Sequence, residues 1–305
     1  MPIKIPDSLP ARAILDAEGV AVMGETDAVR QDIRPLRIGL LNLMPNKVRT
    51  ETQFARLLGA TPIQVELTLV KMTDHVPRNT PADHMASFYR DWSDVREERF
   101  DGFIITGAPV ETMPFEEVRY WEELCRIFDW TQTHVHSSYT ICWAAQAAVW
   151  HFHGMPKYQM PQKLSGIYPH RILAPCSPYL RGLPDHVEIP VSRWTEVRAA
   201  DIPKGSGLDI LLESEEAGLC LLHDPRHRML HMFNHSEYDT DTLAEEYRRD
   251  LAAGKEPSLP RHYFPSDDPS RPPLNRWRGH AHLLFGDWIN QVYQTTPFHL
   301  EDIGN

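Results

Sequence analysis

Cys142 stands where a β-type run changes into a helical run, a position that can make a thiol reactive. Residues 134–141 are rich in β-forming side chains, and residues 143–150 are rich in alanine, the strongest helix former. A cysteine at such a junction lies at a helix N-terminus, where unpaired backbone N–H groups and the helix dipole favour an anion. The thiolate is the nucleophilic form of cysteine. A lone cysteine is more often a small apolar side chain at a strand end, so a catalytic role needs a partner.

His235 and Glu237 are the best candidates for that partner. They follow an apolar β run and stand two residues apart, so on a strand they would face the same side. A carboxylate beside an imidazole fixes its tautomer and stabilises the imidazolium. Cys142, His235 and Glu237 would then form a nucleophile, a base and an orienting group. A His-x-Glu pair alone is about as often an ordinary surface pair.

Composition excludes several classes of protein. The chain has 305 residues, of which 42% are hydrophobic and 24% charged, as in soluble globular proteins. Its net charge of −11 argues against binding to nucleic acid. Apolar runs fall short of the roughly 18–20 residues that span a membrane, and the N-terminus lacks the apolar core of a signal peptide. We therefore expect a cytoplasmic protein that contacts no membrane.

The cysteines and histidines do not predict a metal or redox site. The four cysteines contain no C-x-x-C pair, so we expect free thiols in a reducing cytosol. Three pairs of histidines are spaced two residues apart, but a metal site needs further ligands, and none stands at a familiar spacing. These pairs are His134 and His136, His151 and His153, and His280 and His282.

Strand and helix patterns alternate along the first half of the chain. Strands are predicted at 37–43, 63–70, 103–105 and 134–141, with helices at 47–59, 116–129 and 143–150. This alternation predicts an α/β fold with a mostly parallel sheet and helices on both faces. Ligands bind such folds at the carboxyl ends of the strands, so Gly107 and Cys142 should share one crevice.

The second half is less regular. Strands are predicted at 187–191 and 208–212, and a hairpin at 219–223 and 229–234. A helix at 241–253, with Thr242 and Glu245 as a capping box, precedes a proline-rich loop at 255–277 and a last helix at 280–293. We expect a single domain over 36–305. Residues 1–35 would be an extension that packs on this body or on a second subunit.

The two motifs together resemble those of the class I glutamine amidotransferases, which have a flavodoxin-like fold. That family carries Gly-x-Cys-x-Gly-x-Gln at the nucleophile and His-Pro-Glu at the base. Here Gln146 is kept, but Thr140 and Ala144 replace the glycines and Ser236 replaces the proline. These departures weaken the prediction of ammonia release, and a glutaminase-type amide hydrolase stays an alternative.

A closer resemblance covers nearly the whole chain. The sequence is similar to the homoserine O-acyltransferases of methionine biosynthesis, the branch with an amidotransferase-like fold, over segments 37–47, 106–109, 140–146, 162–168 and 233–239. The resemblance implies that Cys142 is the acylated nucleophile, His235 the general base and Glu237 its partner. It also implies a homodimer, and an amino-acid site lined by Lys163, Ser192 and Arg249. Trp194 stands where many relatives have histidine.

The residue chemistry suits acyl transfer from acyl-CoA to L-homoserine in a ping-pong cycle, without a permanently bound cofactor. The backbone N–H groups of Trp143 and Ala108 would hold the oxyanion. Arg249 would bind the homoserine carboxylate as a fork, although an ion pair with Glu245 one turn away is the alternative. Lys47 and Arg49 are the candidate contacts to the CoA phosphates.

Glu111 bears on the choice of acyl donor. A fixed carboxylate at the lip of the acyl pocket would repel the carboxylate of a succinyl group and accept neutral acetyl-CoA. Within the resembled family, glutamate here is associated with acetyl transfer and glycine with succinyl transfer. The alternative role is that of an acid at the N-terminus of the helix near Glu116. We therefore predict acetyl-CoA as the donor, with succinyl-CoA as the alternative donor. A different possibility for the whole protein is an inactive relative that binds an amino acid.

Overall fold

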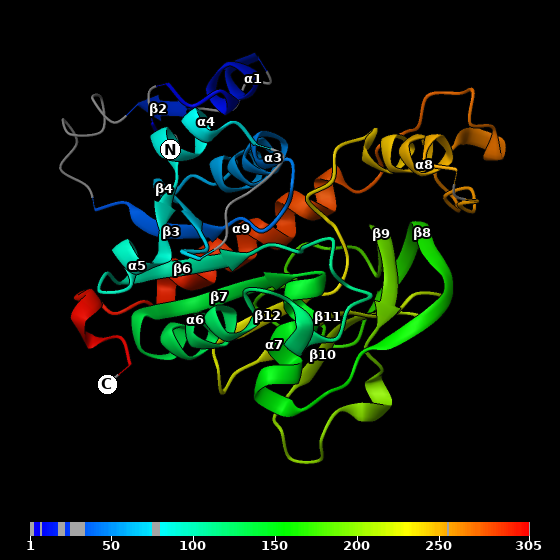
Figure 1. The fold of residues 1–305 in the computed structure, drawn as a ribbon. Helices are drawn as coiled ribbons and strands as arrows, with labels where there is room; N and C mark the ends of the chain where they lie inside the picture. Colours follow the sequence, from blue (N-terminus) through cyan, green and yellow to red (C-terminus); the bar gives the residue numbers. More distant parts are fainter. Residues whose placement is uncertain are drawn as a thin grey trace.

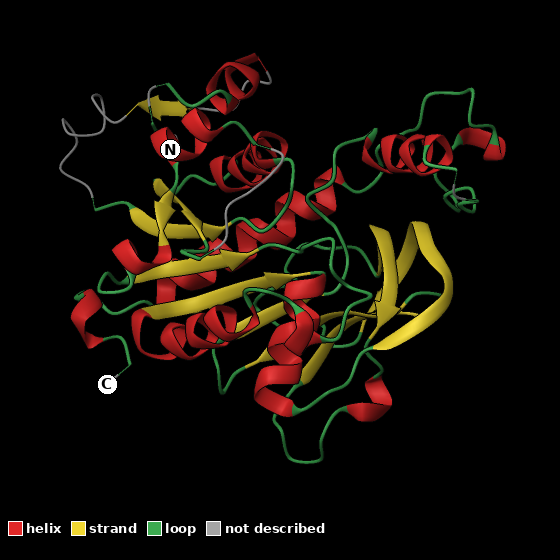
Figure 2. Ribbon diagram, viewed as in Figure 1, coloured by secondary structure: helices red, strands yellow, loops and turns green. Residues whose placement is uncertain are grey.

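One large sheet organises the protein. The computed structural model describes residues 3–6, 8–17, 22–24, 34–74, 80–254 and 256–304. Within them, 12 strands form one sheet in the order β2-β1-β4-β3-β6-β7-β12-β11-β10-β8-β9, with β5 (Arg90–Asp91) beside β4. Helices lie on both faces of the sheet (Figures 1 and 2). The predicted α/β architecture is confirmed.

The parallel half of the sheet has five central strands. Its central strands are β4 (Val65–Lys71), β3 (Leu36–Leu41), β6 (Phe100–Ile105), β7 (Val135–Ile141) and β12 (Met229–Met232). Each neighbouring pair among them is parallel. These apolar runs are buried because helices cover both faces. The carboxyl ends of β3, β6, β7 and β12 therefore meet at one edge.

Helices pack on both faces of this half. On one face, α3 (Lys47–Gly59) and α9 (Arg278–Thr295) pack together through Phe54 and Phe285, whose rings lie 6.0 Å apart. On the other face lie α6 (Trp121–His134) and α7 (Trp143–His153), whose apolar side chains share a core with Phe103. The side chain of Asn46 begins α3 by accepting a hydrogen bond from the N–H of Arg49 at 3.2 Å.

The described part of the first 35 residues extends the sheet. Strand β1 (Ile3–Ile5) pairs in parallel with β4 and with β2 (Val22–Gly24). Between them, α1 (Ala11–Ala17) buries Ala11 and Leu15 in the core beside α3. This segment thus contacts the body of the same chain; the remainder of residues 1–35 lies outside the described residues. The division at residue 36 stays a prediction.

The second half of the sheet is antiparallel. It contains β8 (Tyr158–Ile172), β9 (His186–Glu196), β10 (Asp209–Ser214) and β11 (Gly218–Asp224). The predicted hairpin is the pair β11 and β12, and β8 is an unpredicted strand of 15 residues. Helix α8 (Thr242–Ala252) projects as an arm beyond the ends of β8 and β9 (Figure 1).

Two local predictions are wrong. The helix expected at 116–129 begins at Trp121, because a separate 3-10 turn occupies Phe115–Glu117, and it continues to His134. The capping box at α8 does not form. Asp241 is the N-cap without a side-chain bond, and Thr242 and Glu245 both bind Arg49 instead. The remaining short helices are α4 (Ala82–Phe88) and α5 (Trp92–Val95). No helix of the described residues is long and apolar enough to cross a membrane.

Candidate active site

Cys142 occupies the sharp turn between β7 and α7. Its φ of 53° and ψ of −118° are unusual for a residue with a side chain, and such backbone strain is concentrated at functional sites. Its N–H donates to the carbonyl of Met232 on the neighbouring strand at 2.7 Å, which anchors the turn. Only 7% of the residue is exposed, and it lines a cavity of about 490 Å³ at the carboxyl edge of the sheet. The predicted strand–helix junction is confirmed.

His235 and Glu237 are buried in the loop after β12. His235 Nδ1 lies 2.7 Å from Glu237 Oε1, and the N–H of His235 donates to the carbonyl of Pro190 at 2.9 Å. The expectation that both residues lie on a strand is wrong, since β12 ends at Met232. A turn brings the two side chains together instead.

The environment of His235 favours its charged form. His235 lines the same cavity as Cys142, and its imidazole stacks on the ring of Tyr238, with centroids 4.2 Å apart. Burial lowers the pKa of His235, but the nearby Cys142 and Glu237 raise it by a larger amount. The pKa of His235 therefore lies well above its ordinary value. The three groups have the geometry of a nucleophile, a base and an orienting carboxylate.

The segment after β6 lies directly against the cysteine. A Cβ added at Gly107 would lie 3.1 Å from Cys142 Cβ and 3.6 Å from its Sγ, so a larger residue would crowd the thiol. Ala108 lines the same cavity, and Trp143 is the first residue of α7, where the backbone N–H has no intrahelical acceptor. These positions suit the predicted oxyanion donors, whose role stays a prediction.

Lys163, Ser192 and Arg249 come from three elements, β8, β9 and α8, and all line this cavity. Arg249 donates from Nε and Nη2 to Asp250 Oδ1 at 3.1 and 3.0 Å, so the alternative pairing with Glu245 is not found. The Arg249 side chain remains 65% exposed. The structure thus places the three residues that were predicted to bind the amino acid in the same cavity as Cys142.

Glu246 was missed by the sequence analysis, although it connects several of these side chains. It accepts hydrogen bonds from Lys163 Nζ at 2.9 Å, from Ser192 Oγ at 2.5 Å and from Tyr238 Oη at 2.9 Å. Asp250 lies 3.6 Å from the same lysine. The available signal was the spacing of positions 246, 249 and 250, which share one face of a helix.

Glu111 is fixed at the side of the cavity. Its Oε2 accepts a hydrogen bond from the N–H of Trp194 at 2.8 Å, and Thr195 Oγ1 lies 3.5 Å away. Burial raises the pKa of Glu111, while Trp194, His235 and nearby cations oppose this shift. The residue lies in a turn, and α6 begins only at Trp121, so the alternative role at a helix N-terminus is wrong.

The candidate phosphate contacts are already engaged. Lys47 is buried, its Nζ donates to the carbonyl of Asn42, and burial lowers its pKa to about 8. Arg49 pairs with Asp239 at 3.2 Å, with Asp241 at 3.0 Å and with Glu245. Neither residue lines the active-site cavity. The structure therefore gives no support to them as CoA ligands.

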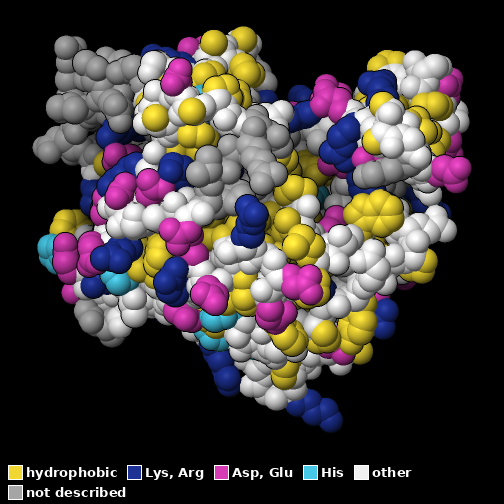
Figure 3. Space-filling model, in the orientation of Figure 1, with side chains coloured by type: hydrophobic (Ala, Val, Ile, Leu, Met, Phe, Trp, Pro, Cys, Tyr) yellow, Lys and Arg dark blue, Asp and Glu magenta, His cyan; other side chains and the backbone are white. Residues whose placement is uncertain are grey.

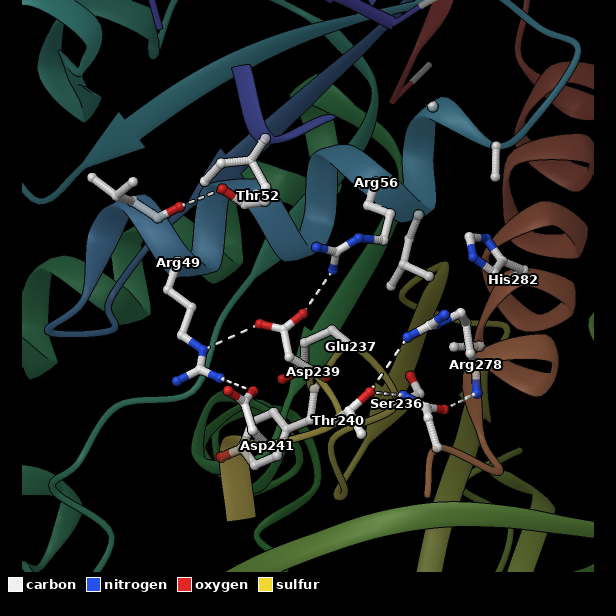
Figure 4. Close-up of a pocket in the computed structure, with 18 of the residues that line it drawn as sticks. Arg49, Thr52, Arg56, Ser236, Glu237, Asp239, Thr240, Asp241, Arg278 and His282 are labelled. Atoms are coloured by element: carbon white, nitrogen blue, oxygen red, sulfur yellow. Dashed lines mark hydrogen bonds and ion pairs between the residues drawn. The ribbon is translucent and has the colours of Figure 1, made fainter. Parts of the chain in front are cut away.

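A second, larger cavity of about 1470 Å³ is lined in part by the segment 236–241, which follows His235. Figure 4 shows Arg49 and Arg56 of α3 pointing toward Asp239 and Arg278 of α9 pointing toward Thr240. Arg56 donates to Asp239 at 2.8 Å. These contacts tie the segment that follows Glu237 to helices α3 and α9. Figure 3 shows the surface hollowed between the part that carries α3 and the arm that carries α8.

Comparisons with solved structures support the fold. A glutamine amidotransferase from Thermotoga maritima superposes with a TM-score of 0.54 at 12% identity, over 85% of this chain and 99% of that chain. A glutamine amidotransferase from Methylobacillus flagellatus gives a TM-score of 0.53 at 15% identity, over 85% and 95%. At these identities the likeness shows the fold alone, which is class I glutamine amidotransferase-like.

Sequence comparisons are far closer. A protein of Rhizorhabdus wittichii named homoserine O-acetyltransferase is 73% identical over all of this chain and 95% of its own length. A protein of Brucella canis with the same name is 69% identical over all of this chain and 99% of its own. The profile named homoserine O-succinyltransferase matches residues 2–298. The chain therefore belongs to the homoserine O-succinyltransferase family.

Proposed function

We propose that the protein transfers an acetyl group from acetyl-CoA to the hydroxyl of L-homoserine, through an acyl-enzyme on Cys142. The observation that carries this proposal is the single cavity that joins Cys142 and His235 to Lys163, Arg249 and Glu111. The names of the two relatives support homoserine as acceptor and acetyl as the transferred group.

In the first half-reaction, the Cys142 thiolate attacks the thioester carbonyl of acetyl-CoA. The new C–S bond leaves an oxyanion, which the N–H groups of Trp143 and Ala108 stabilise; losing one such donor costs roughly 10²–10³ in rate in other enzymes. Collapse breaks the bond to the CoA sulfur, and the departing thiolate takes a proton from the imidazolium of His235. Acetyl-Cys142 and neutral His235 remain.

In the second half-reaction, homoserine replaces CoA. Its hydroxyl gives a proton to His235 while its oxygen attacks the acetyl carbonyl, and Cys142 leaves as the thiolate. Because Nδ1 of His235 donates to Glu237 at 2.7 Å, Nε2 is the nitrogen that accepts this proton. O-acetyl-L-homoserine departs and the ion pair of the free enzyme is restored.

The part of the cavity lined by β8, β9 and α8 would bind the amino-acid part of homoserine. Arg249 has an exposed guanidinium that can turn to a carboxylate and bind it as a fork. Lys163 adds positive charge, and Ser192 adds a hydroxyl beside it. Glu246 and Asp250 hold these groups in place and offset their charge.

The donor assignment depends on Glu111. Its partly buried carboxylate in the cavity would repel the terminal carboxylate of a succinyl group, which favours acetyl-CoA. Succinyl-CoA stays the alternative donor, in line with the family's name. We further propose that acetyl-CoA is a co-substrate with no permanent cofactor, and that the enzyme works in the cytoplasm as a homodimer.

The test is a donor and acceptor comparison with the purified protein. CoA release should be fast with acetyl-CoA plus homoserine, slow with succinyl-CoA, and lost in Cys142→Ser. Faster turnover with succinyl-CoA would overturn the donor assignment. Release of glutamate from glutamine, without acyl transfer, would support an amide hydrolase instead.

A further inference from the structure

A cluster of metal-ligand side chains lies outside the active-site cavity. His153 ends α7, Asp224 ends β11, and His227 lies in the turn before β12. His153 Nε2 is 2.5 Å and His227 Nδ1 is 2.7 Å from the same oxygen, Oδ2 of the fully buried Asp224. The three ligand atoms lie within 4.8 Å of one another.

His231 on β12 aims a fourth ligand atom at this cluster. The residue is fully buried, and its Nε2 lies 3.9 Å from Asp224 Oδ2, with no hydrogen-bond partner in the described part of the chain. Its Nδ1 lies 2.8 Å from Thr140 Oγ1, and that hydroxyl donates to the carbonyl of Leu230 at 3.3 Å. Thr140 thus engages Nδ1, and Nε2 is the ring nitrogen that faces Asp224.

A buried ring nitrogen without a hydrogen-bond partner is costly, and a cation at the centre of the cluster would satisfy it. We propose that His153, Asp224, His227 and His231 bind one divalent cation of the zinc type. Three imidazoles and one carboxylate form a donor set that zinc accepts in tetrahedral geometry, with bonds of roughly 2.0–2.2 Å. Ligand atoms in such a site lie about 3.3 Å apart. The distances to Asp224 Oδ2, from 2.5 to 3.9 Å, span that value.

The surrounding contacts would hold these ligands in position. Thr140 Oγ1 lies 2.8 Å from His231 Nδ1 and would hold this ring in place, as outer hydrogen bonds do at zinc sites. Phe152 stacks on the ring of His227 at 4.1 Å, and Asp224 Oδ1 accepts the N–H groups of Arg226 and His227 at 3.2 Å. His227 is partly exposed, which leaves an entry path.

The ion would fasten the C-terminal end of α7 to the β11–β12 hairpin. Helix α7 has 11 residues, so this end lies about 16 Å from the end that begins after Cys142. The site would therefore be structural, holding the helix whose N-terminus carries the nucleophile. The ligands at 224, 227 and 231 are close in sequence, but the fourth comes from a distant helix, so spacing alone did not reveal the set.

Cobalt(II) is the direct probe, because tetrahedral cobalt gives strong visible absorption. We expect full-length protein stripped with a chelator to bind roughly one cobalt per chain, with this absorption, and to release it to zinc. Zinc should also raise the thermal midpoint of unfolding. His227→Ala should lose both effects. His151→Ala is the matched control on the same helix, because His151 pairs with Asp129 at 2.7 Å outside the cluster, and it should keep both.

Absence of the cobalt absorption, or equal binding by His227→Ala, would overturn the proposal and leave a hydrogen-bonded hub around Asp224. If His227→Ala does not fold, Asp224→Asn serves instead, since the amide keeps the shape but removes the anionic ligand. We expect Asp224→Asn to bind cobalt at least about 10-fold more weakly, because it lacks a charged ligand. Unchanged affinity in that variant would likewise contradict the site.

Discussion

The charge of Glu111 makes a quantitative prediction about donor choice. Its carboxylate is fixed by the Trp194 N–H at 2.8 Å, and it lines the cavity beside Cys142. A second carboxylate about 4 Å away, at an effective dielectric constant of about 20, is repelled by roughly 4 kcal/mol. At about 1.36 kcal/mol per factor of ten, that is nearly a 10³-fold discrimination. We expect Glu111→Gln to raise the ratio of kcat/KM for succinyl-CoA over acetyl-CoA by up to this factor.

Glutamine and glycine at this position separate charge from size. Glutamine removes the charge but keeps an oxygen for the Trp194 N–H, whereas glycine also opens space. The assay follows CoA release with each donor at saturating homoserine, and the exposed Glu117→Gln is the control, which should leave the ratio unchanged. If only Glu111→Gly raises the ratio, the discrimination is steric. If neither variant raises it, the role of Glu111 is refuted.

The pH dependence gives an independent check on the same charge. Burial raises the pKa of Glu111, so this carboxyl gains a proton at a higher pH than an exposed glutamate. Discrimination against succinyl-CoA should therefore be complete above the raised pKa and decline as the pH falls through it. The Glu111→Gln enzyme should show a flat ratio over the same range. An equally steep profile in that variant would assign the titration to another group.

Three further changes test the site and its support. Glu237→Gln removes the charge that holds His235 as the imidazolium; the pKa of His235 should fall and kcat/KM should drop by about 10–10², from the roughly 1.5–3 kcal/mol of a hydrogen bond to a charged group. The limb of the pH profile of kcat/KM that reports His235 should move to lower pH in parallel, and an unchanged profile would contradict the role of Glu237. Gly107→Ala places a methyl group 3.1 Å from Cys142 Cβ and crowds the thiol, so kcat/KM should fall at least about 10-fold, whereas full activity would show that the space is not used. Asp239→Asn leaves two arginines of α3 without their shared anion and should lower the free energy of unfolding by about 1–2 kcal/mol, measured by urea titration; no loss would mean that these partly exposed pairs contribute little.

Sequence patterns predicted the parallel half of the fold because its strands are buried on both faces and its helices are amphipathic. The antiparallel half was harder to predict. Strand β8 contains Pro161, Gly166 and Pro169, residues that usually argue against a strand. It forms nonetheless by pairing with β9, with an irregular register between Gln159 and Leu164. Long-range pairing of this kind leaves no local signal.

In the candidate site, too, local features could be predicted from the sequence, whereas long-range contacts could not. The junction around Cys142 has a local signature, and the pairing of His235 with Glu237 could be expected from their spacing, although a turn and not a strand achieves it. By contrast, the contacts of Glu246 with Lys163 and Ser192 and the anchoring of Glu111 by Trp194 join segments over 50 residues apart. The chemistry of single residues was therefore predictable, but the network that holds them was not.

In the proposed mechanism, Cys142 carries the acetyl group between donor and acceptor. The most direct test is mass spectrometry of the intact and digested protein, quenched after mixing with acetyl-CoA in the absence of homoserine. We predict one added acetyl group per chain, located on Cys142, lost when homoserine is added and absent from Cys142→Ser. A protein that turns over acetyl-CoA and homoserine but never carries acetyl on Cys142 would contradict the account.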